Sequence, residues 1–326
     1  MGPVSEDDLI ARWFAPIAGP AALGLKDDAA CLTPPAGQDL IITKDALVAG
    51  VHFFAEDAAA SIARKALRVN VSDLAAKGAQ PAGFLLALAL PVETQASWLA
   101  EFARALGEDA KLWHIPLMGG DTVKTPGPLM VSITALGFVP QGQMVARTSV
   151  QPGDAIYVSG TIGDAALGLQ LRLNPERFAT LSDEARAHLA QRYLEPQPRL
   201  ALASVLRAHA SGGMDVSDGL VGDLTKMMTA SGVSAQINLD LVPLSEAARA
   251  AIAADESLLE TALTGGDDYE LLVSIRPDQA GAFEAAAARA GIRVAQIGHA
   301  LAGQGASQFT RSGHAISFER GSFSHF

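Results

Sequence analysis

Asp215-Val216-Ser217-Asp218-Gly219-Leu220 places two carboxylates and a hydroxyl within four positions and then stops at a glycine. Hard oxygen ligands of this kind bind divalent cations. The run from Leu220 to Ser231 has the composition of a helix, and the N–H groups at a helix N-terminus suit a phosphate. The same residues also describe an ordinary strand-to-helix turn with an N-cap, and the stretch alone does not separate the two interpretations. An EF-hand is excluded, because the glycine comes one position too early and no Glu closes a twelve-residue loop.

A similar pattern occurs in the first half of the chain, at Asn70-Val71-Ser72-Asp73-Leu74. Other carboxylates lie in acidic pairs, at a strand end or after paired glycines: Asp27-Asp28, Asp45, Gly119-Gly120-Asp121-Thr122 and Gly265-Gly266-Asp267-Asp268. Carboxylates at glycine turns along the whole chain predict one metal–phosphate site that is assembled from many loops.

Composition narrows the class of protein. The chain has 326 residues, of which 49% are hydrophobic and 18% charged, so one large or two ordinary folded domains are expected. The formal net charge of -11 argues against a nucleic-acid partner and against an anionic membrane surface. An acidic protein that handles phosphates needs cations, which again points to magnesium. Cys31 is the single cysteine, so no intrachain disulfide can form and a reducing compartment is expected.

The N-terminus and the hydropathy pattern predict a cytoplasmic protein. Met1-Gly2-Pro3-Val4-Ser5-Glu6 lacks the basic region and apolar core of a signal peptide. The longest apolar run, from Phe84 to Leu90, is far too short to span a bilayer.

Strand-like and helix-like segments alternate along the chain and predict an α/β or α+β protein. Strands are expected at Leu40–Asp45, Phe84–Leu90, Leu129–Val139, Ala155–Ser159, Ala235–Leu239, Glu270–Ile275 and Ile292–Ile297. Helices are expected at Ala58–Lys77 with a break near Asn70, and at Thr94–Leu112, Asp183–Glu195, Pro198–Ser211, Leu220–Ser231, Ser245–Ala254 and Pro277–Ala290. The turn residues between Pro140 and Gly153 predict two domains, residues 1–145 and 146–326.

Several other catalytic motifs are excluded. A Walker A loop fails because Gly24-Leu25-Lys26 stands where Gly-Lys-Ser/Thr is required. The sequence also contains no protein-kinase signature, no HExxH or CxxC zinc pattern and no Gly-x-Ser-x-Gly elbow. Phosphate chemistry assisted by a hard cation is the best-supported class that remains.

Six acidic or glycine-containing blocks occur in a characteristic order. They are Gly24–Ala30, Asp45–Phe53, Val69–Ala79, Gly119–Thr122, Asp215–Leu220 and Gly265–Leu271. Together they resemble the thiamine-monophosphate kinase family, and the resemblance extends from about Ser5 to Phe326. The Asp45 and Gly265 blocks are specific to that family. The Asp73 and Asp218 blocks are shared with the wider superfamily of aminoimidazole-ribonucleotide synthetase and selenophosphate synthetase.

The resemblance implies a reaction and an architecture. The reaction is ATP-dependent phosphorylation of thiamine monophosphate to thiamine diphosphate, by direct in-line transfer with Mg²⁺ and with ATP as co-substrate. The architecture is a two-domain synthetase-like homodimer. Its N-terminal domain would bind ATP and metal and would pair its sheet across the dimer two-fold, while its C-terminal α/β domain would complete the substrate site.

The resemblance also implies roles for individual residues. Metal-ligand positions correspond to Asp28, Thr43, Asp45, Asp73, Asp121, Asp215 and Asp218. ATP-binding positions correspond to Gly120, Asp121, Arg147 and Ser217, and positions that bind thiamine monophosphate correspond to His52, Asp267 and Phe323. No further catalytic residue is required, since the acceptor phosphate is already ionised and phosphoryl transfer needs positioning and charge neutralisation. An aromatic ring such as that of Phe323 suits the cationic thiazolium.

Three positions depart from the family pattern. Lys44 stands where Thr is usual, Asp267 where Glu is more common, and Leu25-Lys26 where Ile-Gly is usual. Strand alternation predicts that Thr43 and Asp45 share one face and that Lys44 points to the other. If the strand instead ends by Thr43, the Lys44 ammonium would reach the carboxylates.

Two alternative functions remain open at this point. One is a different ATP-dependent synthetase of the same superfamily. The other is a non-catalytic protein that binds thiamine phosphate or a divalent ion. Release of ADP in the presence of thiamine monophosphate would separate an enzyme from a binding protein.

Overall fold

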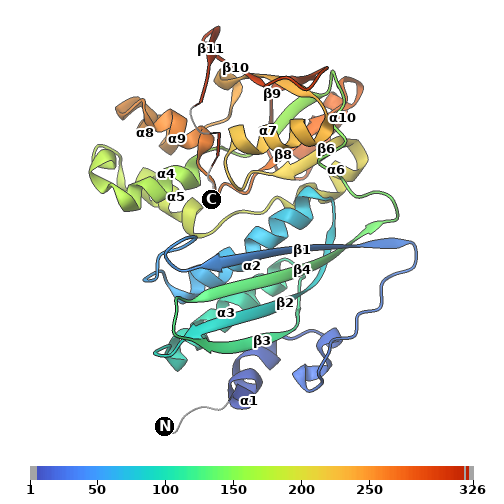
Figure 1. The fold of residues 1–326 in the computed structure, drawn as a ribbon, viewed down its shortest axis with the longest axis vertical. Coiled ribbons are helices and arrows are strands. Elements are labelled where there is room, and N and C mark those ends of the chain that lie inside the picture. The colour runs from blue at the N-terminus through green and yellow to red at the C-terminus, as the bar shows by residue number, and fades with distance from the viewer. Residues whose placement is uncertain (1–5, 319–320, 323–326) are drawn as a thin grey trace. The chain divides into compact units, whose positions relative to one another are not determined.

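The computed structural model describes residues 6–318 and 321–322 (Figure 1). The chain divides into two compact units. The first contains the described residues up to Leu74 together with Ala79–Gly142, and the second contains Ala75–Gly78 together with the described residues from Gln143 onward.

The first unit is built on a four-stranded sheet with the order β1-β4-β2-β3. The strands are β1 (Gln38–Val48), β2 (Gln80–Pro91), β3 (Leu117–Thr125) and β4 (Met130–Pro140). β4 pairs antiparallel with both β1 and β2, and β2 pairs parallel with β3. Figure 1 shows the long helices α2 (Ala59–Ala76) and α3 (Ala96–Leu112) on one face of this sheet. The chain before β1 forms short helical turns: α1 (Glu6–Leu9), η1 (Ile10–Phe14), η2 (Ala15–Ile17) and η3 (Pro20–Leu25).

Side-chain alternation along β1 explains how this sheet is covered. Ile41 and Leu47 are buried, whereas Leu40 and Ile42 are exposed. One face of β1 therefore belongs to the core and the other lies open, as expected for strand residues of opposite parity.

Two local predictions for the first unit were wrong. The helix from Ala59 to Ala76 is continuous, although a break was expected near Asn70. The Asn70 side chain is buried, and its Nδ2 donates a 3.0 Å hydrogen bond to the Ala66 carbonyl one turn earlier, so this polar side chain is accommodated without interrupting the helix. The Gly119–Thr122 segment is part of strand β3 and is not a turn, because Gly120 lies directly against the Leu86 backbone of β2, where a Cβ would approach the Leu86 carbonyl oxygen to 1.9 Å.

The second unit is built on a seven-stranded sheet with the order β11-β10-β7-β9-β5-β8-β6. The strands are β5 (Ala155–Ser159), β6 (Ala210–Asp215), β7 (Ser234–Asn238), β8 (Leu271–Ile275), β9 (Val294–Leu301), β10 (Gln308–Arg311) and β11 (His314–Ile316). β10 pairs parallel with β7, and the other neighbouring pairs are antiparallel. The α/β (α+β) fold class is therefore confirmed.

Helices cover both faces of the second sheet. They are α4 (Asp164–Leu173), α5 (Asp183–Leu194), α6 (Ala203–His209), α7 (Leu220–Ser231), α8 (Glu246–Ala254), α9 (Leu258–Thr264) and α10 (Ala280–Arg289). Val158 belongs to the apolar core that includes Leu224 of α7, and its neighbour Tyr157 belongs to the core that includes Phe283 of α10. Alternate residues of β5 thus enter different cores, and all five of its residues are buried. A third apolar cluster joins α4, α5, α8 and α9.

Strand β6 was not predicted, and the helix expected to extend to Ser211 ends at His209. The segment Ala210-Ser211-Gly212-Gly213 has neither apolar alternation nor branched side chains. It forms the sheet edge beside β8 and carries Asp215 at its end. Across residues 6–318 and 321–322, no helix combines the length and the apolar character that crossing a bilayer requires.

Candidate functional site

Three of the predicted metal ligands lie on the helix-covered side of the first sheet. Thr43 points from β1 toward α2, where its Oγ1 donates a hydrogen bond to Oδ2 of Asp73. Asp45 lies two residues further along β1 and therefore on the same face as Thr43. A hydroxyl and two carboxylates, all oxygen donors, are thus brought to one side of the sheet.

Lys44 faces the opposite side of the same sheet. Its Nζ donates to Ser132 Oγ at 2.8 Å and to Thr134 Oγ1 at 3.4 Å, both on β4. This confirms the predicted alternation of faces and shows that the strand does not end at Thr43, since β1 continues to Val48.

A cavity of about 830 Å³ lies on the Lys44 side of the sheet. Its lining includes several predicted ligand positions and their neighbours: Asp27, Asp28, Lys44, Gly119, Gly120, Asp121, Ser132 and Thr134. Asp28 and Asp121 therefore share this cavity with Gly120, whereas Thr43 and Asp73 meet on the helix side. The predicted ligands of the first unit thus form two groups.

Lys44→Thr is expected to change turnover by less than ~threefold, which is below ~1 kcal/mol of activation barrier. The ammonium bonds to two neutral hydroxyls, and water can replace it there. The ATP-dependent activity that the resemblance implies should be titrated against Mg²⁺ for the wild type and for Lys44→Thr. Lys124→Thr, at an exposed position of β3, is the matched control. A half-saturating Mg²⁺ concentration that shifts in Lys44→Thr but not in the control would contradict this expectation and would make the ammonium part of the metal site.

His52 is held in the turn after β1. Its Nδ1 accepts a 3.0 Å hydrogen bond from the Val48 N–H, and its carbonyl oxygen accepts one from Lys65 Nζ at 2.9 Å. Because Nδ1 is an acceptor, the proton of the neutral ring resides on Nε2.

The Asp215–Gly219 loop of the second unit joins β6 to α7. Asp223, which is buried in the first turn of α7, accepts hydrogen bonds at 2.9 Å from the backbone N–H groups of Ser217 and Asp218. Gly219 has a φ of +117°, and a Cβ there would lie 2.5 Å from the Thr264 carbonyl oxygen. The loop is thus held by Asp223 and by a close backbone approach, and Ser217 does not cap α7 through its side chain.

Lys226 provides the cation beside these carboxylates. Its Nζ contacts Asp218 Oδ2 and also Asp223 Oδ1 at 3.0 Å. Burial raises the pKa of Asp223, against the lowering effects of the Asp218 N–H and of Lys226. Neither Asp223 nor Lys226 was singled out from the sequence, although they form an i,i+3 pair within the predicted helix that follows Asp218.

The Gly265–Glu270 segment packs directly against this loop. Asp267 N–H donates to the Ser217 carbonyl oxygen and Tyr269 N–H to the Val216 carbonyl oxygen, both at 2.8 Å. Gly266 permits the approach, since a Cβ there would lie 2.3 Å from the Ser217 carbonyl oxygen. A predicted substrate residue, Asp267, is therefore adjacent to Ser217 and Asp218 within one unit.

Two other predicted site residues, Arg147 and Phe323, are not placed beside the predicted ligands described above. Arg147 is exposed, and its carbonyl oxygen accepts a 2.9 Å hydrogen bond from Ser231 Oγ at the C-terminal end of α7, the end opposite Asp218. Phe323 lies outside the described residues.

The predicted ligands carry the kind of donor atom that suits a hard cation. Within the part of the chain that the structure describes, no three histidine, cysteine, aspartate or glutamate side chains converge closely enough to hold a metal ion. Thr43, Asp73 and Asp218 nevertheless offer only oxygen. Magnesium is usually bound by one or two carboxylates together with substrate phosphates and water, so separate oxygen donors fit it.

Comparison with known proteins places these features in context. Residues 26–139 match the family described as AIR synthase related protein, N-terminal domain, and residues 151–309 match its C-terminal domain. Thiamine-monophosphate kinase of Caulobacter vibrioides is 45% identical over 312 residues, which cover 94% of this chain and 87% of that protein.

Solved structures agree with this result. The crystal structure of thiamine-monophosphate kinase from Stenotrophomonas maltophilia K279a has a TM-score of 0.81 and 40% identity, covering 90% of this chain and 91% of that one. AaThiL complexed with AMPPCP and TMP has a TM-score of 0.78 and 28% identity, covering 92% and 91%.

Proposed function

The chain belongs to the thiamine-monophosphate kinase family, and we propose that it transfers the γ-phosphoryl group of ATP to thiamine monophosphate in one in-line, magnesium-dependent step. As a member of that family it is a thiamine-phosphate kinase, a phosphotransferase with a phosphate group as acceptor. The observation that carries the proposal is the packing of the Asp215–Gly219 loop on the Gly265–Glu270 segment. That packing sets the proposed nucleotide residue Ser217 beside the proposed acceptor residue Asp267.

The chemistry needs little from the side chains beyond positioning. An acceptor phosphate oxygen is ionised at neutral pH, so no general base has to remove a proton. Magnesium held by the predicted carboxylates would neutralise the charge of the phosphates. The chain's own residues orient these groups. We assign metal binding to Asp28, Thr43, Asp45, Asp73, Asp121, Asp215 and Asp218, nucleotide binding to Gly120, Asp121, Arg147 and Ser217, and acceptor binding to His52, Asp267 and Phe323.

The proposed enzyme is a homodimer that pairs the sheets of its first units. The open face and edges of that sheet expose large apolar side chains at Leu40, Ile42, Leu85 and Val123. Exposed apolar patches on a sheet mark interaction surfaces. Both units contribute proposed ligands: Asp28, Asp45, Asp73 and Asp121 belong to the first, and Asp215, Ser217, Asp218 and Asp267 belong to the second.

Thiamine monophosphate should be converted to thiamine diphosphate only when ATP and Mg²⁺ are both present, and free thiamine should be a poor acceptor. Free thiamine lacks the phosphate oxygen that attacks ATP. A coupled assay of ADP release should be run with each acceptor, with and without EDTA, and the thiamine diphosphate formed should be measured directly. Binding of thiamine monophosphate without ADP release would support a non-catalytic binding protein, and equal use of free thiamine would contradict the proposed reaction.

A further inference from the structure

The turn that carries Asp267 has an unusual backbone. Asp267 has a φ of +75° and Tyr269 a φ of +51°, both in the left-handed region that side chains other than glycine rarely adopt. Non-glycine residues keep such conformations only where the surrounding structure holds them, and they are concentrated at functional sites. The contacts that hold this turn are therefore informative about the site.

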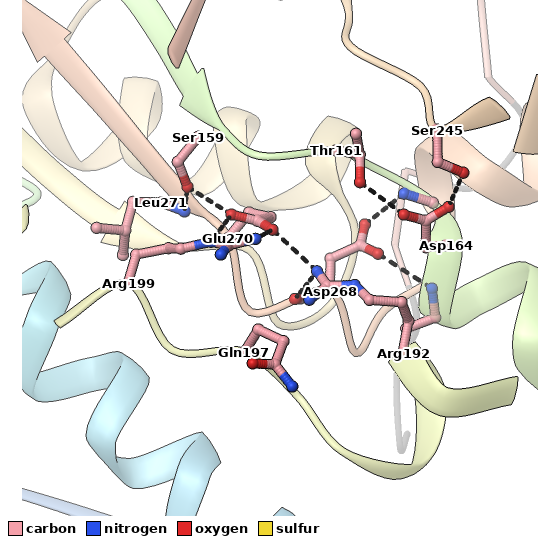
Figure 2. A network of polar contacts seen from close by, with 12 residues as sticks. Ser159, Thr161, Asp164, Arg192, Gln197, Arg199, Ser245, Asp268, Glu270 and Leu271 are labelled. Carbon is pink, nitrogen blue, oxygen red and sulfur yellow. Dashed lines mark hydrogen bonds and ion pairs between the residues drawn. The ribbon is translucent and has the colours of Figure 1, made fainter. Parts of the chain in front are cut away.

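The residue between them, Asp268, is anchored inward. It is 1% exposed, and its carboxylate accepts hydrogen bonds from Gly163 N–H at 2.6 Å and Ala165 N–H at 3.3 Å, at the start of α4 (Figure 2). Arg192 Nη2 also donates to its carbonyl oxygen at 3.3 Å. Burial raises the pKa of Asp268 to about 8, against the lowering effects of the Gly163 N–H, of the Arg192 charge and of the Ala165 N–H.

Glu270 forms a second inward anchor. It is fully buried, and it accepts hydrogen bonds from Ser159 Oγ at 2.6 Å, from Arg192 Nη2 at 2.9 Å, and from both Nε (2.6 Å) and Nη2 of Arg199. Figure 2 shows the two arginines meeting the same carboxylate. Ser159 Oγ in turn accepts a 2.8 Å hydrogen bond from Leu271 N–H. A buried carboxylate with two guanidiniums and a hydroxyl has its charge compensated and its oxygens satisfied.

The two anchors determine where Asp267 lies. The side chains of Asp268 and Glu270 are buried and hydrogen-bonded. The intervening Tyr269 and the preceding Asp267 therefore lie against the Asp215–Gly219 loop. Their N–H groups bond to that loop at 2.8 Å. The Tyr269 hydroxyl lies 3.4 Å from Asp267 Oδ1. The nucleotide-side residues Ser217 and Asp218 have a separate anchor in Asp223.

We propose that Arg192 and Arg199 are positioning residues for the acceptor: by holding Glu270 they keep the Gly266–Tyr269 turn in the left-handed conformation that presents Asp267 to thiamine monophosphate. This inference rests on the proposed function, in which Asp267 contacts the acceptor. Because Ser217 and Asp218 have an additional anchor in Asp223, loosening the Glu270 cluster weakens acceptor binding more than nucleotide binding.

Arg199→Met tests the proposal, since the side chain is 21% exposed and the substitution retains its apolar stem. The KM for thiamine monophosphate should rise by roughly fivefold or more, as expected when a hydrogen bond to a ligand is misaligned, while the KM for ATP stays within ~twofold. Arg199→Lys keeps the charge but loses the two-pronged contact and should give an intermediate KM. If Arg199→Met does not fold, the KM of Arg199→Lys tests the proposal in its place.

Arg177→Met is the matched control. Arg177 also makes a two-pronged contact, from Nε (3.0 Å) and Nη2 (2.6 Å) to Asp255, in the same unit but on the short η4 turn (Pro175–Phe178). This variant should lower the melting temperature without changing either KM. An equal rise in the KM for thiamine monophosphate in Arg177→Met and Arg199→Met would overturn the proposal.

A double-mutant cycle with Asp267→Ala separates positioning from general stability. In the Asp267→Ala background, Arg199→Met should still lower the melting temperature but should raise the KM for thiamine monophosphate no further. The same rise in both backgrounds would overturn the positioning role, and an unchanged KM in Asp267→Ala alone would overturn the role assigned to Asp267 and the inference with it. Wild-type turnover in the same assay reports separately on the proposed function.

Discussion

Asp218→Asn and Asp73→Asn are each expected to lower turnover at least ~100-fold at saturating Mg²⁺ and substrates, the loss seen when one charge-stabilising group is removed from a reaction centre. Asn keeps the shape of the side chain but offers no negative charge to a metal ion. The two residues belong to different units and come from equivalent sequence blocks, so a similar loss in both variants would indicate that both blocks serve one reaction.

The fold should survive both substitutions. Asp218 is 41% exposed at its side chain and its partner Lys226 is 42% exposed, and ion pairs with this exposure contribute about 0–1 kcal/mol to stability. Asn at position 73 can still accept the hydrogen bond from Thr43 Oγ1. Melting temperatures in the absence of Mg²⁺ should therefore match that of the wild type within a few degrees. Asp183→Asn, at an exposed carboxylate that pairs with Arg186, is the control and should leave turnover unchanged. Full turnover of Asp73→Asn or Asp218→Asn would reject its assignment as a metal ligand.

Glu270→Gln is expected to lower the free energy of unfolding by ~3–5 kcal/mol, the cost of removing one partner from a buried charge cluster. The substitution leaves the Arg192 and Arg199 guanidiniums, with side chains 9% and 21% exposed, facing a neutral amide. Its NH₂ group also finds no acceptor on the Arg192 and Arg199 guanidiniums, which only donate. Urea unfolding followed by circular dichroism measures the change.

Glu256→Gln is the control for this effect. Glu256 pairs with Arg311 at 2.9 Å on the surface, with the glutamate side chain 78% exposed, so its loss should change stability by less than about 1 kcal/mol. A similar small change in Glu270→Gln would mean that the buried cluster does not stabilise the fold.

Much of the secondary structure could be predicted from the sequence. The alternation in Leu40–Asp45 predicted a strand with Thr43 and Lys44 on opposite faces, and both features are present. Phe84–Leu90 and Ala155–Ser159 also lie in strands. These predictions succeeded because the preference of a strand for apolar and branched residues, and the direction of successive side chains, are set within a few residues.

Other local predictions failed because distant elements decided the outcome. The helix break expected near Asn70 does not occur, since the buried side chain bonds to the Ala66 carbonyl in the packed helix. The paired glycines at 119 and 120 extend a strand because a neighbouring strand, β2, approaches Gly120 too closely for any side chain. Strand β6 exists because β8 supplies its hydrogen bonds, although its own residues favour a loop.

For the site, the sequence by itself determined which chemical groups are available: carboxylates at Asp73 and Asp218, and a glycine-bordered acidic turn at Asp267. Only the tertiary structure decided which of them meet. It set Asp267 against Ser217 and separated Thr43 and Asp73 from the cavity that Asp28 and Asp121 line. It also brought Arg192 and Arg199 to Glu270 from more than 70 positions earlier in the chain. The physical reason is that local propensity acts over a few residues, whereas a buried charge is stable only beside a partner that folding brings to it through space.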